Sequence, residues 1–184
     1  MALIAALLLA AVMSAALGGL TMIASIERRA AAAHVVGLRL RLAAAGALAV
    51  TAEELAVRDW RDALAGSGSA TWRRSLNPPV DLTALTQALQ RETMIETSHG
   101  ADTPVWHLFA HMAWSDVSGH DGGGQTVVWV ADDWSEGDAD PSRDQNGLLL
   151  VRVAALSGSA TAWTEGLCRR EPSGRIQMRH VRSW

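Results

Sequence analysis

The stretch MALIAALLLAAVMSAALGGLTMIASI, residues 1–26, contains no Asp, Glu, Lys, Arg or His. A helix needs about 20 consecutive apolar residues to cross a bilayer, so this stretch is long enough to do so. It is followed by Glu27-Arg28-Arg29 and then by Ala- and Leu-rich sequence that favours helix to about Leu64. The sequence therefore predicts a membrane-length helix that continues, without an intervening loop, as an amphipathic helix.

Small residues recur through residues 1–26. Six of them, Ala5, Ala6, Ala10, Ser14, Gly18 and Gly19, would let helix backbones approach closely in lipid or in a bundle of identical helices. A generic anchor with common small residues is the alternative. The Gly18-Gly19 pair weakens a helix by roughly 2 kcal/mol relative to Ala, so we expect a bend or local melting there, which surrounding lipid would oppose.

Residues 27–65 are the expected amphipathic part of the helix. Apolar residues recur there at spacings near three and four, which indicates one apolar stripe that packs on the rest of the chain. The stripe consists of Val35, Val36, Leu38, Leu42, Ala45, Ala49, Ala52, Leu55, Ala56 and Trp60. The segment Gly66-Ser67-Gly68-Ser69 predicts the end of the helix.

Residues 66–184 leave about 120 residues, enough for one small domain. Asp81 is a suitable N-cap for a short helix with Leu82, Leu85 and Leu89 on one face. Five segments then have the pattern of strands: 105–114, with apolar residues at 106, 108, 110, 112 and 114, then 126–131, 148–155, 160–168 and 176–182. The sequence therefore predicts an α+β fold with a mainly antiparallel sheet of four or five strands. The apolar face of this sheet lies against the amphipathic half of the long helix.

Composition excludes several classes of function. The net charge of −3 argues against nucleic acid as a partner. The single cysteine, Cys168, cannot form an internal disulfide or a metal site built from cysteines alone. The sequence has no Gly-x-Ser-x-Gly elbow and no recognisable pairing of a nucleophile with a base, so we do not expect an enzyme.

An acidic cluster follows the segment 126–131. Carboxylates in a glycine-bearing loop are ligands that calcium prefers, and the candidate ligands are Asp133, Glu136, Asp138, Asp140 and Asp144. The alternative is a solvated acidic loop that pairs with the arginines near the C-terminus. Trp134, inside the cluster, and Trp184 are the two tryptophans that we expect to contact a partner.

The layout of a half-apolar, half-amphipathic helix followed by a small sheet domain resembles type IV pilins and pseudopilins. MALIAALLL (residues 1–9) is similar to the start of PilX-like minor pilins after their leader. The segments SIERRAAA (25–32), AEELAVRDWRDALAG (52–66) and VVWVADD (127–133) with EGDADP (136–141) also resemble that family. The resemblance is strongest at residues 1–66 and 126–155.

This resemblance implies a minor pilin or pseudopilin whose leader is removed, whose new N-terminus, Met1, is methylated, and whose helix packs with other pilin subunits. It also implies residence in the inner membrane before assembly, then in an extracellular filament. Major pilins carry glutamate at the fifth mature position, where this chain has Ala5. That difference favours a low-copy priming or tip subunit. The alternative is a single-pass, membrane-anchored extracytoplasmic domain that binds a partner, with calcium as its cofactor.

Overall fold

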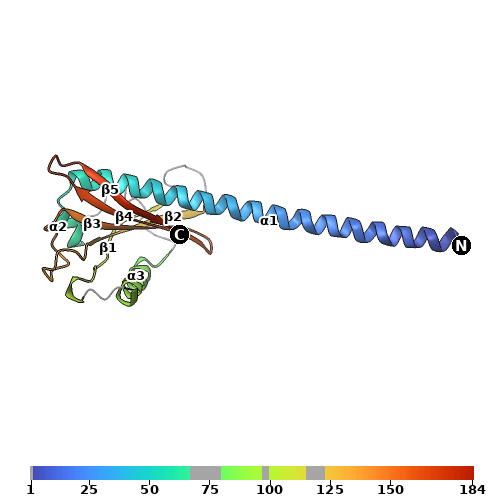
Figure 1. Cartoon of the computed structure of the whole chain (residues 1–184), viewed down its shortest axis with the longest axis horizontal. Coiled ribbons are helices and arrows are strands. Elements are labelled where there is room, and N and C mark those ends of the chain that lie inside the picture. The colour runs from blue at the N-terminus through green and yellow to red at the C-terminus, as the bar shows by residue number, and fades with distance from the viewer. Residues whose placement is uncertain (1, 67–79, 97–99, 115–122) are drawn as a thin grey trace. The chain divides into compact units, whose positions relative to one another are not determined.

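The computed structural model describes residues 2–66, 80–96, 100–114 and 123–184. Its elements, shown in Figure 1, are α1 (Ala2–Val57), α2 (Trp60–Leu64), α3 (Leu82–Glu96), the 3₁₀ turn η1 (Gly100–Asp102), β1 (His107–Ala113), β2 (Gly124–Asp132), β3 (Leu148–Ser157), β4 (Ala160–Arg170) and β5 (Ile176–Ser183). The chain forms two compact units, residues 1–38 and residues 39–184, and α1 contributes to both.

The first unit is the N-terminal part of α1. Among the described residues, α1 is the one helix long and apolar enough to span a membrane, with a mean hydropathy of 2.4 in its most apolar window. Helix α1 is continuous through Gly18-Gly19, so the local melting expected there is absent. The hydroxyl of Thr21 donates to the carbonyl of Gly18 at 2.9 Å, and that of Ser25 donates to Met22 at 2.7 Å. These bonds satisfy both hydroxyls within the helix, as an apolar surrounding requires.

The second unit is built around a five-stranded antiparallel sheet in the order β1-β2-β3-β4-β5. All five segments with the pattern of strands form strands, and every end lies within two residues of its expected position. The near-continuous apolar runs of β2 and β3 form the middle of the sheet, where they are buried on both faces. The structure thus confirms an α+β layout in which a long helix packs on a small antiparallel sheet.

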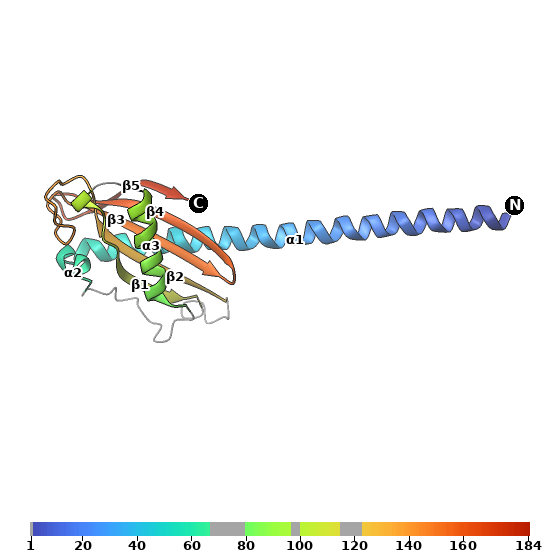
Figure 2. The ribbon, with the colours of Figure 1, turned by 90° about the horizontal axis from the view of Figure 1, so that it is seen from below.

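Helices cover both faces of the sheet (Figures 1 and 2). On one face, residues 39–57 of α1 and the short α2 bury a cluster that includes Leu48, Leu55, Val128 and Val151. On the other face, α3 lies across the strands and buries Leu89 together with residues such as Trp106, Trp129 and Leu150. The sequence indicated the first layer only, so the cover provided by α3 is a finding of the structure.

The face of α1 that packs on the sheet differs from the predicted stripe. The buried residues are Leu40, Ala44, Ala47, Leu48, Thr51 and Leu55. Of the predicted stripe within residues 39–65, Leu55 and Trp60 are buried, but Leu42, Ala45 and Ala49 are exposed. The prediction was wrong here because apolar residues occur on nearly all sides of this Ala-rich segment, so periodicity alone does not select the buried side.

Gly166 on β4 explains how closely α1 approaches the sheet. A Cβ atom at this position would lie 3.3 Å from a methyl carbon of Leu48 and 2.6 Å from the sulfur of Met178. The absence of a side chain at Gly166 therefore leaves the space that Leu48 and Met178 occupy.

Strand β1 does not have the single apolar face expected from alternation. A β-bulge lies between Leu108 and Ala110, which pair with Trp129 and Val128. Leu108 packs with the cluster under α3, whereas Ala110 packs with the cluster under α1. The extra residue, Phe109, shifts the alternation by one position, so the predicted face of residues 106–114 is divided between the two sides of the sheet.

The helix also ends earlier than predicted. Helix α1 stops at Val57, and α2 starts after Asp59, whose backbone is extended. The carboxylate of Asp59 caps α2 by accepting from the Arg61 amide at 3.0 Å. The carbonyl of Leu55 accepts from the indole of Trp60 at 2.9 Å and from the guanidinium of Arg170 at 3.0 Å. Arg170 also donates to the carbonyl of Arg58 at 2.7 Å. The nearby Trp60 and the distant Arg170 therefore satisfy carbonyls that the end of α1 leaves open.

The N-cap predicted from the sequence places the start of α3 correctly. The carboxylate of Asp81 accepts from the Ala84 amide at 2.9 Å, which confirms the predicted N-cap. Thr86 and Thr93, two turns apart, accept from the indoles of Trp129 at 2.8 Å and Trp106 at 2.7 Å. These two bonds fix the position of α3 on the sheet.

Arg170→Ala tests whether Arg170 stabilises the C-terminal end of α1. The substitution removes two hydrogen bonds to backbone carbonyls and the stacking of the guanidinium 4.2 Å above the ring centre of Trp60. We expect the free energy of unfolding to fall by about 2–4 kcal/mol, measured by denaturant titration of the full chain in detergent. Arg169→Ala, at an exposed neighbouring position, should change it by less than about 0.5 kcal/mol. Equal effects of the two substitutions would contradict this role for Arg170.

Candidate functional site

The acidic loop, residues 133–147, connects β2 to β3 and is held by its own carboxylates. Asp144 accepts from the amides of Gly147 at 2.8 Å and Leu148 at 3.1 Å. Glu136 accepts through Oε1 from the amides of Gln145 and Asn146, both at 2.7 Å. These bonds join the two ends of the loop, so Glu136 and Asp144 lie beside the end of β2.

Three carboxylates meet at this point. Asp132, the last residue of β2, Glu136 and Asp144 each place one carboxylate oxygen within 4.8 Å of the others. Asp132 is buried, and Glu136 and Asp144 are half-buried. The Oε2 atom of Glu136 is buried and receives no hydrogen bond from the described residues. This carboxylate triad concentrates negative charge in a place where water supplies little screening.

The other predicted ligands lie outside the triad. Asp133 accepts from the amide of Ser135 and from the side chain of Asn146. Asp138 accepts from the Asp140 amide and the side chain of Gln145. Asp140 accepts twice from Ser142. Of the five residues predicted as calcium ligands, the structure brings together Glu136 and Asp144, and the third member is Asp132.

Burial and charge repulsion raise the pKa values of two carboxylates of the triad. Burial, with the nearby charge of Glu136, raises the pKa of Asp132 to about 7. Burial also raises the pKa of Asp144, although the amides of Gly147 and Leu148 oppose the rise. In the exposed part of the loop the pKa shift has the opposite sign, because hydrogen bonds from Ser142 lower the pKa of Asp140. The triad therefore favours a proton or a cation near neutral pH.

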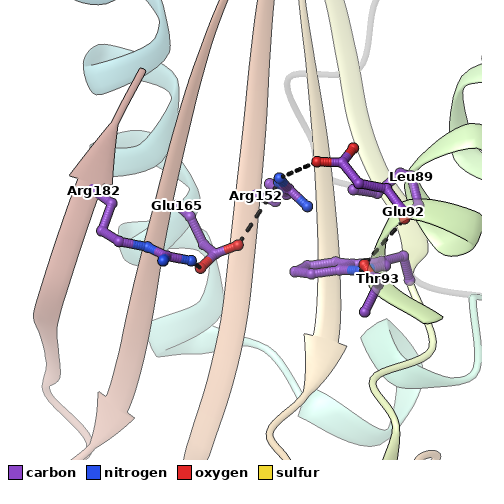
Figure 3. A network of polar contacts seen from close by, with 7 residues as sticks. Leu89, Glu92, Thr93, Arg152, Glu165 and Arg182 are labelled. Atoms are coloured by element: carbon purple, nitrogen blue, oxygen red, sulfur yellow. Dashed lines mark hydrogen bonds and ion pairs between the residues drawn. The ribbon is translucent and has the colours of Figure 1, made fainter. Parts of the chain in front are cut away.

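A second polar cluster lies under α3 and centres on Arg152 (Figure 3). Arg152, 5% exposed in its side chain, bonds Glu92 of α3 at 3.1 Å and lies 3.7 Å from Glu165 of β4. Glu165 also pairs with Arg182 of β5 at 2.6 Å. The chain of charges connects α3 to three neighbouring strands. A charged residue inside the apolar run 148–155 was the sequence signal for this cluster.

Two tryptophans surround Arg152 on the sheet. Its guanidinium lies 5.3 Å from the ring centre of Trp163 and 5.0 Å from that of Trp184. Trp184, expected to contact a partner, therefore covers an internal charge, although it is still half exposed. A buried, paired arginine between aromatic rings is a structural arrangement, and it places no reactive group at the surface.

Trp134, the other suspected tryptophan, lies beside a cleft. The cleft has a volume of about 600 Å³, and its walls include Leu150, Leu167, Val181 and Arg182. Trp134 is 44% exposed. Arg182 at this cleft pairs with Glu165 rather than with a carboxylate of the acidic loop, and Arg170 is bound to the carbonyls at the end of α1. The described C-terminal arginines Arg170 and Arg182 thus have partners outside the loop, although Arg170 is near enough to Asp144 to lower its pKa.

The residues predicted for filament packing lie in the first unit. Ala6, Ala10, Ser14, Gly18 and Gly19 are exposed on α1. Met1 lies outside the described residues, and nothing is described of the Ala5 side chain. A Cβ atom built on Gly18 or Gly19 would meet nothing within 4 Å, so both positions are open to a neighbouring helix.

No known family, curated protein or solved structure matches this chain.

Asp132→Asn tests the raised pKa of Asp132. Because the pKa of Asp132 is higher in the folded chain than its ordinary value of 3.8, the folded state binds a proton that the unfolded state has released. Stability should therefore fall as pH rises from about 4 to 7. In calcium-free buffer Asp132→Asn should flatten this slope and raise stability at pH 8 by on the order of 2 kcal/mol. Thermal melting of the full chain in detergent at several pH values measures both.

Asp140→Asn is the matched control, because it removes a carboxylate from the same loop at a position where the pKa is lowered. It should not raise stability at pH 8. The same gain in both variants would mean that only the net charge of the loop matters.

Proposed function

We propose that this chain is a structural subunit of a type IV pilin-like filament. The observation that supports the proposal is the single helix α1. Its first part is apolar and exposed on all sides, and its last part, residues 39–57, packs on an antiparallel sheet. A membrane-length segment and a folded domain are thus joined by continuous helix.

This continuity has a mechanical consequence. A helix transmits force and orientation along its axis, whereas a flexible linker lets the domain turn independently of its anchor. An anchored binding domain functions with either connection. In a filament subunit, unbroken helix would lead from the packed apolar segments into each domain. Continuous helix therefore favours the filament subunit over a simple anchor.

We further propose that the subunit is a low-copy priming or tip subunit, processed and methylated at Met1, and located in the inner membrane before assembly. Ala5 supports the low-copy role, because it offers no carboxylate to pair with the amino terminus of a neighbouring subunit. Ala6, Ala10, Ser14, Gly18 and Gly19 are the residues that would allow close packing with other pilin subunits. We propose no catalytic activity for this chain.

Mass spectrometry of the N-terminal peptide tests the proposal. In material sheared from cells that produce the chain, we expect a processed N-terminus carrying one added methyl group on Met1. The membrane fraction of the same cells is the control for unassembled protein. An unprocessed N-terminus confined to membranes would contradict the filament role.

The carboxylate triad favours a second candidate, a membrane-anchored extracytoplasmic domain that binds calcium. Three carboxylate oxygens within 4.8 Å, with Glu136 Oε2 buried and without a hydrogen bond from the described residues, are suited to a hard cation. A bound cation would also compensate the repulsion that raises the pKa of Asp132.

A calcium titration tests this candidate. Millimolar calcium should raise the melting temperature of the full chain, and more at pH 8 than at pH 6, because calcium competes with the proton on Asp132. Asp144→Asn keeps a hydrogen-bond acceptor for Gly147 but removes a charge, so it should abolish the calcium-dependent rise. Asp138→Ala and Asp140→Ala, outside the triad, should retain it. No rise at millimolar calcium in the unaltered chain would exclude the calcium site.

A further inference from the structure

Strand β5 forms one edge of the described sheet, because it pairs with β4 and with no other described strand. Figure 2 shows it at the rim of the sheet. Trp163 and Trp184 exchange both of their backbone hydrogen bonds, at 2.9 and 3.1 Å. Bonded and non-bonded pairs alternate in an antiparallel ladder, so Ser183, which pairs with Thr164, directs its N–H and C=O away from β4. This end of β5 therefore presents backbone groups to a neighbour outside the sheet.

The other end of β5 presents the same kind of groups. The amide of Glu171 donates to the carbonyl of Arg175 at 2.9 Å. By the same alternation, Ile176 and Met178 direct their N–H and C=O away from β4. An edge strand with such groups along its length is a template on which another extended chain can pair.

The α3 side of the sheet is only partly covered at β4 and β5. Along residues 162–168 of β4, buried positions on the α1 side alternate with half-buried positions on the α3 side, which include Leu167. The cleft beside Trp134 lies in this open part, and its walls include Leu167 and Val181. Val181 belongs to β5 and is 52% exposed, so the cleft extends to the edge strand.

A side chain of an added strand could reach this cleft. Side chains directly opposite each other on neighbouring strands are about 5 Å apart, and diagonal neighbours are about 7–8 Å apart, within reach of an aromatic ring. A strand beside β5 would place every second side chain on the α3 side. One large apolar side chain there would cover Val181 and enter the cleft.

Three exposed arginines flank this edge: Arg169 near the end of β4, Arg175 in the turn before β5, and Arg179 on β5. Arg179 pairs with Leu167 and therefore lies on the α3 side, where it lines a hollow of about 480 Å³ together with Arg169 and Glu171. None of the three arginines forms an ion pair with another described residue. The edge therefore has an excess of positive charge, although the whole chain has a net charge of −3.

This charge selects the occupant of the edge. Two copies of β5 side by side would bring like charges together, which is unfavourable for strand pairing. The acidic loop of a second copy is not free to extend as a strand, because Glu136 and Asp144 bond the loop's own amides. Charge complementarity therefore favours an acidic strand from a different protein.

We propose that the edge of β5 binds an extended, acidic segment of another protein as a further strand of the sheet. Main-chain hydrogen bonds to β5 supply affinity. Carboxylates of the segment lie beside Arg169 and Arg179, and one apolar side chain occupies the cleft beside Trp134. The proposal goes beyond the proposed function and does not depend on it, since a filament subunit and an anchored binding domain could both use this edge.

Peptide binding to the full chain in detergent micelles tests the proposal. The probe is a set of capped, fluorescein-labelled peptides of about seven residues, a typical strand length, that alternate glutamate with valine and carry tryptophan at each glutamate position in turn. We expect fluorescence polarisation to show saturable binding of at least one peptide, with a dissociation constant below about 1 mM. Micelles without protein are the blank. Peptides with lysine in place of glutamate should bind at least about tenfold more weakly.

N-methylation of the peptide tests the strand pairing. In an added strand, the amides of alternate residues face β5 and the amides between them face solvent. Methylation of the glutamate and tryptophan amides in one peptide, and of the valine amides in another, therefore blocks opposite edges of the same strand. We expect one of these two peptides to lose binding and the other to retain it.

Charge reversal on the protein tests the place of binding. At physiological salt, Arg179→Glu should weaken binding of the glutamate peptides by about tenfold and strengthen binding of the lysine peptides. Arg61→Glu, at an exposed position of α2, is the matched control and should change neither. Val181→Asp should remove the roughly fivefold advantage of a tryptophan peptide over its alanine counterpart. All three positions are exposed, and circular dichroism checks that the variants are folded.

Any of five results would overturn the proposal: no binding by any peptide of the set, equal effects of the two methylation patterns, equal effects of Arg179→Glu and Arg61→Glu, a tryptophan preference unchanged by Val181→Asp, and self-association of the unaltered chain that the peptides displace. The last would assign the edge to a second copy. The filament role fails on a different measurement, the absence of a methylated N-terminus from sheared material. Peptide binding without that methylation would keep the edge site and reject the filament role.

Discussion

The burial of one side of α1 against the sheet is the interaction on which the second unit depends. Leu40, Ala44, Leu48 and Leu55 are nearly inaccessible to solvent there, and Gly166 leaves the space that Leu48 enters. Removal of this apolar surface from water is the main favourable contribution to such packing. It also brings the end of α1 to Arg170, so that the last carbonyls of the helix are satisfied by a side chain of the sheet.

Because helices cover both faces of the sheet, each charge inside needs a nearby partner. A buried ion without compensation is costly, and the structure provides Arg152 with Glu92, Glu165 and two tryptophan rings. Arg170 and Arg182 are likewise engaged in holding the domain together. These arginines therefore bond outside the acidic loop, two of whose carboxylates, Glu136 and Asp144, lie beside Asp132 of β2.

Exposed apolar surface on α1 is the physical basis of the proposed function. In its first unit the helix is apolar and exposed on all sides, and in its second unit it keeps an exposed apolar side although the sheet covers the other. Both features concern surface that an isolated chain in water would leave unfavourably exposed. The proposed function would cover this surface with lipid before assembly and with other subunits in the filament.

The sequence by itself determined the elements whose signals are local. Residues 1–26 read as a membrane-length helix because they lack charge, Asp81 reads as an N-cap, and the strands follow from short apolar or alternating runs between turn residues. Only the tertiary structure decided which side of α1 is buried, since apolar residues occur all around residues 42–56. It also decided the bulge at Phe109, which depends on pairing with β2, and the meeting of Asp132 with Glu136 and Asp144, which depends on closure of a loop. These features arise from contacts between residues distant in the chain, and no local pattern encodes such contacts.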